Sequence, residues 1–174
     1  MSKRLFLLRH AKAVRGDDPS GDFTRPLTDR GVIDARALGR HLAEAGHRPE
    51  LVLCSPARRT RETWLSLAEW LKDSVVEFDP GLYGADAGAI LTRLRQVAAN
   101  VPSLMVIGHN PGIGDLALDL VAAADTQPGA GLAHMRAKFP TAALAVFTVP
   151  TATWSELRSG LCPLTAFRRP HPVG

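Results

Sequence analysis

Three short apolar runs each end in a polar cluster, and this pattern constrains the fold of the 174-residue chain more than any other feature. LFLLRH ends in Arg9 and His10, LVLCSP ends in Ser55, and LMVIGHNPG ends in His109 and Asn110. Short apolar runs between polar residues are typical of strands that are buried on both faces of a sheet. We therefore expect each polar cluster where a strand leaves the sheet, which is the edge where open α/β sheets bind ligands.

Segments with helical periodicity separate these runs, because apolar residues recur there at the spacing of one helix face. This alternation predicts an α/β fold of βα units around a mostly parallel sheet. Residues 151–157 are expected to return as the second strand of a β-hairpin, with Pro150 in or beside its turn at a sheet edge. The expected strands are residues 4–9, 51–54, 75–78, 104–107 and 144–149, and the expected helices are residues 28–45, 57–71, 86–99 and 112–123.

Residues 11–27 connect the first strand to the first helix and have no periodicity of their own. Strand-to-helix loops usually have about 2–6 residues, and much longer ones are usually functional or disordered. This connection carries Asp22 and Arg25. We therefore consider it a candidate part of a binding site.

The length suits one domain that covers residues 1–174. Its 21 basic and 17 acidic residues give a net charge of +4, which favours an anionic partner. The sequence has no basic stripe interleaved with aromatic residues, so we expect no nucleic-acid partner. It also has no expected signal peptide or membrane span, so we expect no membrane partner. Cys54 and Cys162 have no metal or redox spacing, and a buried, inert Cys54 is favoured over a reactive one. A reducing cytoplasm is the expected location; the oligomeric state stays open, and a monomer is compatible with the sequence.

Two expected helix starts share a capping pattern, because Ser55-Pro56 and Asn110-Pro111 each place an N-cap residue type before proline. A helix N-terminus has partial positive charge and suits a bound anion.

Three arginines nevertheless crowd the first turns of the second helix: Arg58, Arg59 and Arg61. This arrangement favours anion binding over helix stability. For Arg58 and Arg61 a solvated surface charge is the favoured interpretation, so the prediction depends on the joint occurrence of Arg9, His10, Arg59 and His109 at strand-to-helix junctions.

Two histidines also raise the question of a metal site. No Asp or Glu accompanies His10 or His109 at ligand spacing, and the arginines would repel a divalent cation. We therefore expect no metal. The remaining chemistry is an anion held by Arg and His side chains, with one histidine as nucleophile, and phosphoryl transfer fits it.

The segments LLRHAKA, RPLTDRG, SPARRTRET, VIGHNPGIGD and KFPTAALAVF resemble the histidine phosphatase superfamily, and within it the short SixA-type phosphohistidine phosphatases. The resemblance runs from residue 4 to about residue 149. It implies a phosphoglycerate mutase-like three-layer α/β/α sandwich, a phosphohistidine intermediate, and no cofactor.

The resemblance also assigns roles to single residues. His10 is the nucleophile, and its second ring nitrogen must donate its proton to a fixed acceptor so that the attacking nitrogen keeps its lone pair. Arg9, Arg59 and a protonated His109 form the phosphate pocket, and Arg25 is a further phosphate ligand from the long connection.

Many relatives in this superfamily have a glutamate as general acid, but the corresponding stretch here, DPGLYGADAG, has none. An alcohol leaving group would need that acid more than the nitrogen of a phosphoramidate does. Asp22 is the candidate for an acid or orienting role, with a loop-capping role as the alternative. Asp86 is expected to cap the third helix.

The resemblance and the missing glutamate favour phosphohistidine in a protein as the substrate, in a role such as signal transduction. The absence of an inserted cap is compatible with an open pocket. Three alternatives remain: a phosphatase of small phosphomonoesters, a non-catalytic phosphate-binding module, and a basic nucleic-acid binder, whose affinity would fall steeply with salt.

Overall fold

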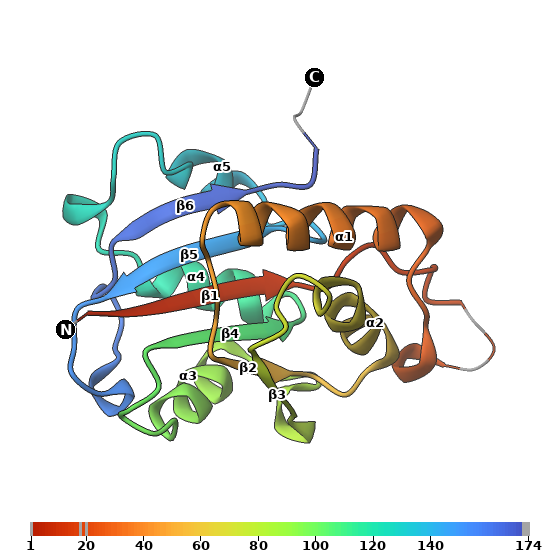
Figure 1. The fold of residues 1–174 in the computed structure, drawn as a ribbon, viewed down its shortest axis with the longest axis horizontal. Helices are drawn as coiled ribbons and strands as arrows, with labels where there is room; N and C mark the ends of the chain where they lie inside the picture. Colours follow the sequence, from red (N-terminus) through yellow and green to blue (C-terminus); the bar gives the residue numbers. More distant parts are fainter. Residues whose placement is uncertain (1, 18, 20, 172–174) are drawn as a thin grey trace.

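The computed structural model describes residues 2–17, 19 and 21–171, and the described chain forms one six-stranded sheet with helices on both faces (Figure 1). The strands lie in the order β3-β2-β4-β1-β5-β6. The first four strands along the chain are parallel, and antiparallel β5 separates β1 from the edge strand β6. The strands are β1 (Lys3–Arg9), β2 (Leu51–Cys54), β3 (Val75–Phe78), β4 (Ser103–Gly108), β5 (Leu144–Val149) and β6 (Leu164–Arg168).

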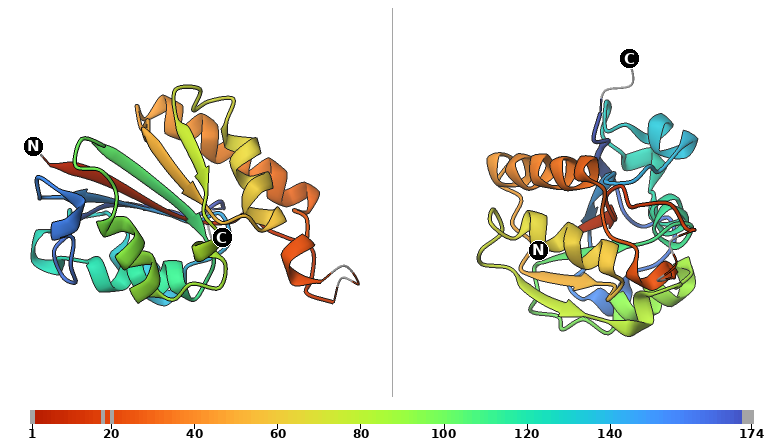
Figure 2. Two further views of the ribbon diagram at one scale, coloured as in Figure 1. Left: turned by 90° about the horizontal axis from the view of Figure 1, so that it is seen from below. Right: turned by 90° about the vertical axis from the view of Figure 1, so that its right-hand side faces the viewer.

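The helices form two layers, with α1 and α2 on one face of the sheet and α3 and α4 on the other (Figure 2). Phe6 and Leu8 of β1 pack with Trp64 of α2, whereas Leu5 and Leu7 face the opposite layer. The structure therefore confirms the predicted three-layer α/β/α sandwich with a mostly parallel sheet. The helices are α1 (Asp29–Glu44), α2 (Arg58–Leu67), α3 (Ala87–Arg95), α4 (Gly112–Leu120) and α5 (Leu132–Ala137).

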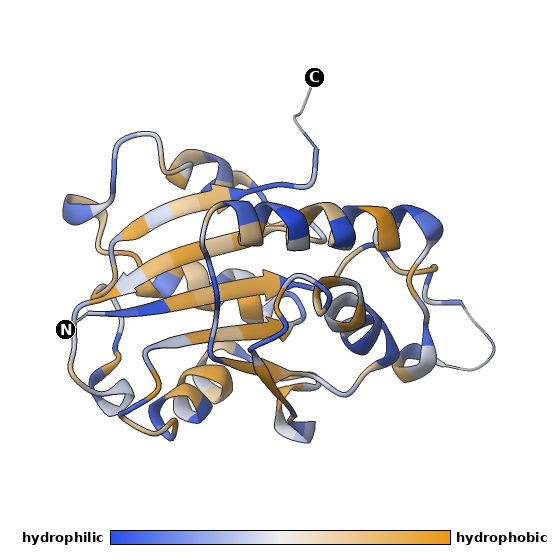
Figure 3. Ribbon diagram, in the orientation of Figure 1, coloured by the Kyte–Doolittle hydropathy of each residue, from blue (hydrophilic) through white to orange (hydrophobic). Residues whose placement is uncertain are grey.

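Burial on both faces explains why the strands appear in the sequence as continuous apolar runs. Leu5 to Leu8 of β1 and Leu104 to Ile107 of β4 are all completely buried. A strand between two helical layers needs apolar side chains at consecutive positions, not at alternate ones. Figure 3 shows that hydrophobic residues are concentrated along the central strands.

The expected hairpin after β5 is wrong. β5 instead pairs with β6, and residues 154–156 form a 3-10 helix. Thr153 and Glu156 form a capping box there, and the buried Trp154 donates its indole N–H to the Val101 carbonyl at 2.9 Å. Burial of this tryptophan and the capping box fix the turn conformation, so Pro150 ends an inner strand and does not mark a sheet edge.

The two expected Ser/Asn-Pro caps are also wrong in detail. α2 begins at Arg58 with Ala57 as its N-cap, and α4 begins at Gly112 after Pro111. The Asn110 side chain still accepts the backbone N–H of Gly114 at 3.1 Å. Asp86 caps α3 as predicted, because its carboxylate accepts the N–H of Ala89 at 2.8 Å.

The strand register brings three strand ends to the same level. Arg9 pairs with Gly108, and Cys54 pairs with Ile107, so β1, β2 and β4 end together. The polar residues that follow each strand therefore meet at one edge of the sheet. No helix among the described residues is long and apolar enough to cross a membrane.

Candidate active site

His10, Arg59 and His109 meet at this edge of the sheet, and all three are buried. The ring centroids of His10 and His109 are 5.3 Å apart. Arg59 donates its Nε–H to Nε2 of His10 at 3.3 Å. The structure thus brings together residues from three separate segments that the sequence placed at strand ends.

The hydrogen bonds of His10 define its tautomer. Nδ1 lies 2.7 Å from the carbonyl oxygen of Ala11, which can only accept, so Nδ1 carries the proton. Nε2 therefore has the lone pair and accepts from Arg59. Burial lowers the pKa of His10 to about 3, with smaller contributions from His109 and the nearby arginines. A neutral imidazole with an unprotonated Nε2 is a competent nucleophile at neutral pH.

His109 lies beside His10 and contacts the hydroxyl of Ser55, with 2.7 Å between Nε2 and Oγ. Burial, and next the charge of Arg59, lower the pKa of His109 to about 4. In the free protein the ring of His109 is therefore neutral at pH 7, whereas the predicted protonated form concerns the ring beside a phosphoryl group. A bound dianion would reverse this effect, because a negative charge favours the imidazolium form.

Arg9 completes the buried cluster from the end of β1. Its Nη1 donates to the carbonyl oxygen of Phe139 at 3.2 Å. Among the residues that the structure describes, Nε of Arg9 and Nδ1 of His109 are buried polar atoms without a hydrogen-bond partner. Buried polar groups normally have partners, so these two atoms suit an anion with several acceptor oxygens.

The connection between β1 and α1 places Asp22 against Arg59. A short 3-10 helix, Asp22–Thr24, carries this aspartate, and an antiparallel bridge between Ala13 and Leu27 closes the connection. The backbone carbonyl of Asp22 accepts the Nη1–H of Arg59 at 2.8 Å, and its Oδ2 lies 3.2 Å from Nη2. Asp22 therefore brings the connection into contact with Arg59.

Arg25 is turned toward Asp22. Its Nε and Nη2 donate to Oδ1 of Asp22 at 3.0 and 2.9 Å, and its Nη1 donates to the carbonyl of Val14 at 2.7 Å. Its contact with the cluster therefore runs through the Asp22 carboxylate, which bridges Arg25 and Arg59.

Asp22 is held in its ionised form. The hydroxyl of Tyr83 donates to its Oδ2 at 2.5 Å, and this bond is the main cause that lowers the pKa of Asp22, ahead of Arg25 and Arg59. An ionised carboxylate has no proton to donate. The arrangement therefore favours the orienting role for Asp22 over the role of general acid.

Sequence reasoning missed Tyr83 and Phe23 as parts of the site. Tyr83 is the only tyrosine of the chain, and it lies in the stretch DPGLYGADAG that lacks the glutamate. It touches both Phe23 and His109 through edge-to-face ring contacts. Ser55 lies at the edge expected for the strand-end clusters, where it contacts His109 and does not cap α2.

Arg58 and Arg61 lie outside the cluster. Arg58 is exposed and pairs with Glu62 one helical turn away, at 2.8 Å. The guanidinium of Arg61 lies 5.9 Å from the ring centroid of Phe78. Arg58 and Arg61 are therefore the surface charges that the sequence analysis allowed for, whereas Arg59 points inward to His10. Cys54 is buried, and burial raises the pKa of its thiol to about 12.

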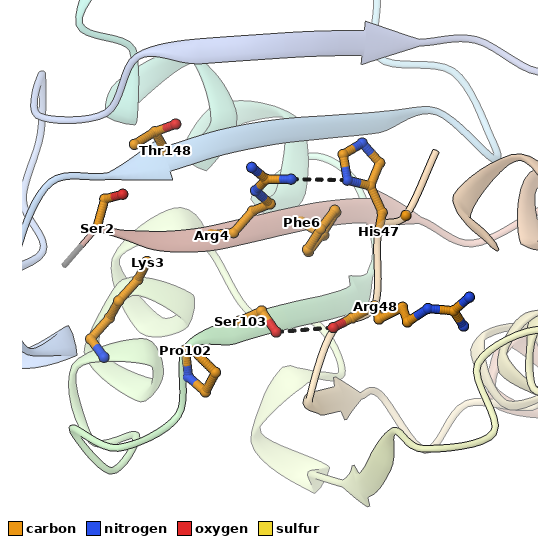
Figure 4. A pocket seen from close by; sticks show the side chains of 10 residues that line it. Ser2, Lys3, Arg4, Phe6, His47, Arg48, Pro102, Ser103 and Thr148 are labelled. Carbon is orange, nitrogen blue, oxygen red and sulfur yellow. Dashed lines mark hydrogen bonds between the residues drawn. The ribbon is translucent and has the colours of Figure 1, made fainter. Parts of the chain in front are cut away.

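No group of three or more His, Cys, Asp or Glu side chains in the described ranges is placed to hold a metal ion. A separate pocket of about 280 Å³ lies at the opposite ends of β1 and β4 (Figure 4). Arg4, His47 and Ser103 line it, and none of the clustered residues does. It is therefore distinct from the candidate site.

The fold and the site define an α/β protein with two buried histidines and two arginines gathered at one edge of the sheet. The sequence model of the histidine phosphatase superfamily, branch 1, matches residues 5–112. The chain belongs to the histidine phosphatase superfamily. An uncharacterized protein of Mycobacterium tuberculosis is 34% identical over 163 residues, which cover 94% of this chain and 99% of that protein.

Two solved structures extend the comparison. A structure from Nakamurella multipartitia, assigned as phosphohistidine phosphatase SixA, has a TM-score of 0.81 and 31% identity, and the match covers 100% of this chain and 98% of that one. The protein histidine phosphatase SixA in complex with tungstate has a TM-score of 0.75 and 28% identity, with 96% and 97% of the two chains covered. The comparisons support a phosphatase that acts on a phosphorylated substrate.

Proposed function

We propose that this chain is a metal-independent phosphatase that acts through a phospho-His10 intermediate and removes phosphate from phosphohistidine in a protein. The observation that carries the proposal is the state of His10. Its Nδ1 proton is fixed on the Ala11 carbonyl, and its Nε2 lone pair faces Arg59. This is the arrangement that a nucleophilic imidazole needs beside an anion site.

In the first step, Nε2 of His10 attacks phosphorus, and the bond from phosphorus to the leaving nitrogen breaks. The leaving ring takes the electron pair of that bond and departs as neutral imidazole, because its other nitrogen accepts a proton from solvent before cleavage. Arg9 and Arg59 bind the equatorial oxygens, whose charge they offset. His109 presents Nδ1 to the same oxygens, since Ser55 holds its other nitrogen.

In the second step, a water oxygen attacks the phosphorus of phospho-His10. The bond between phosphorus and Nε2 breaks, the electron pair returns to Nε2, and the proton of the water goes to solvent. Inorganic phosphate leaves, and Nδ1 keeps its proton on the Ala11 carbonyl throughout. The nucleophile is thus neutral again for the next turnover.

Two observations favour phosphohistidine over a phosphate ester. The similar solved structures are described as SixA phosphohistidine phosphatases. In addition, Asp22 is ionised, so the site has no evident acid for an alkoxide leaving group. The two cysteines are buried and free, which is compatible with a reducing cytoplasm.

The test compares kcat/KM for a phosphohistidine peptide with that for a panel of small phosphomonoesters. We expect the phosphohistidine peptide to be preferred, and we expect His10→Asn to abolish its turnover. His47→Asn is the matched control, because His47 lies at the opposite end of the sheet beside Arg4. A preference for phosphomonoesters would identify the small-molecule phosphatase, and phosphate binding without turnover would identify a non-catalytic module.

A further inference from the structure

Four aromatic rings form a continuous series from the proposed nucleophile to the surface. His10 contacts His109 at 5.3 Å between ring centroids, His109 contacts Tyr83 at 5.7 Å, and Tyr83 contacts Phe23 at 5.1 Å. The exposed fractions are 6% for His10 and 9% for His109, but 43% for Phe23 and 39% for Tyr83. The series therefore ends in two exposed rings, which we call the aromatic rim.

The aromatic rim is held in register with the arginines. The Tyr83 hydroxyl donates to Oδ2 of Asp22 at 2.5 Å, and the same carboxylate pairs with Arg59 and Arg25. Phe23 follows Asp22 in the same short helix. Asp22 thus links the aromatic rim to the arginines, while the contacts with Phe23 and His109 hold the Tyr83 ring in place.

The direction of attack places the leaving group near the aromatic rim. Attack in line from the buried Nε2 of His10 requires the leaving group on the opposite side of phosphorus. Nε2 of His10 faces Arg59, and Arg59 contacts Asp22, which binds Tyr83, so the side that Nε2 faces is the side of the aromatic rim. An exposed aromatic pair at the mouth of a charged site offers an apolar contact surface where the leaving group must lie.

We propose that Phe23 and Tyr83 select for a planar aromatic leaving group, namely the imidazole of phosphohistidine, over an alkylamine. This inference rests on the proposed function and names the residues that set its substrate preference. An imidazole ring can stack on the rim or meet it edge to face, whereas an alkylamine has no ring face to offer. The two residues act in specificity and take no part in the transfer of the phosphoryl group.

The test uses two peptides of identical flanking sequence, one with phosphohistidine and one with phospholysine. Both substrates contain a P–N bond, so their ratio of kcat/KM isolates the contribution of the ring. We expect Phe23→Leu and Tyr83→Leu each to lower this ratio about three- to tenfold, from the usual strength of one aromatic contact. Circular dichroism and thermal unfolding check that each variant is folded.

Two further variants separate the ring from other effects. Tyr83→Phe keeps the ring and removes only the hydroxyl bond to Asp22, so we expect the wild-type ratio. Phe78→Leu is the matched control, because Phe78 is similarly exposed but contacts Arg61. It should also keep the wild-type ratio.

Equal losses on both substrates in the leucine variants, or an unchanged ratio, would overturn the inference. So would a lower ratio in Tyr83→Phe, because the hydroxyl and not the ring would then set the preference. In each case wild-type turnover of phosphohistidine leaves the proposed function standing. A wild-type protein that cleaves neither P–N substrate would overturn both the proposed function and this inference.

Discussion

Asp22 binds Arg59 twice, through its backbone carbonyl at 2.8 Å and through its carboxylate at 3.2 Å. The Asp22 carboxylate therefore binds the same guanidinium that we propose binds the phosphoryl oxygens of the substrate. The same carboxylate also engages Arg25. A bound phosphate and the Asp22 carboxylate must then share or compete for these arginines.

Removal of the Asp22 charge should strengthen anion binding. In Asp22→Asn the arginines lose a competing carboxylate, so the local potential becomes more positive. We expect the Kd for tungstate, measured by calorimetry, to fall about three- to tenfold, a modest effect because Asp22 is half exposed. Asp119→Asn, at an exposed aspartate that binds Ser159, is the control. Weaker or unchanged tungstate binding in Asp22→Asn would contradict this account of the loop.

The two neighbouring arginines of α2 should differ strongly. Arg59→Ala removes a buried guanidinium that contacts His10 and Asp22, and we expect kcat/KM to fall about 10²- to 10³-fold, as for loss of one transition-state donor. Arg58→Ala removes only an exposed pair with Glu62, so activity should stay within about threefold. Steady-state assays on one phosphohistidine peptide measure both. Equal losses of activity would contradict the assignment of Arg59, and not Arg58, to the site.

Much of this arrangement follows from the sequence because both the sheet and the site depend on local patterns. LFLLRH, LVLC and LMVIG are buried on both faces, so their apolar runs mark strands directly. Parallel strands then place the residues that follow them at one edge of the sheet. This is why the sequence predicts that His10, Arg59 and His109 lie close together. Arg59 was separable from Arg58 only through the resemblance.

The features that the sequence did not predict depend on contacts between distant segments. Tyr83 belongs to the site because its ring contacts His109 and the connection before α1 brings Asp22 against its hydroxyl. β6 is a short edge strand with mostly half-buried residues, so it lacks a strong pattern. The neutral state of His109 is a consequence of burial and of Arg59, which periodicity cannot measure.

The pKa of His10 should appear in the dependence of stability on pH. The pKa is about 3 in the folded chain, against 6.5 for an ordinary histidine, so between these values only the unfolded chain binds the proton. Stability is therefore fully present above about pH 6.5 and falls as the pH falls, by up to about 1.4 kcal/mol per pH unit for this group. Denaturant unfolding from pH 6 to pH 4 should show a shallower loss in His10→Asn. Parallel curves for the variant and the wild type would contradict the low pKa.

Activity should not depend on a metal ion. The proposed chemistry uses imidazole and guanidinium groups only, so overnight treatment with a chelator should leave kcat/KM for the phosphohistidine peptide within about twofold of its starting value. Added magnesium or zinc should give no gain. Loss of activity with the chelator and recovery with one of these metals would overturn the metal-independent mechanism.

The central claim is that the phosphoryl group is transferred from the substrate to Nε2 of His10 before water releases it. The most direct measurement is a rapid quench of the enzyme with a phosphohistidine peptide labelled on phosphorus, followed by location of the label in proteolytic fragments. We predict an acid-labile, alkali-stable label on the fragment that contains His10, present in the His47→Asn control and lost in His10→Asn. Turnover at the wild-type rate in His10→Asn, or a label on any other residue, would contradict the account.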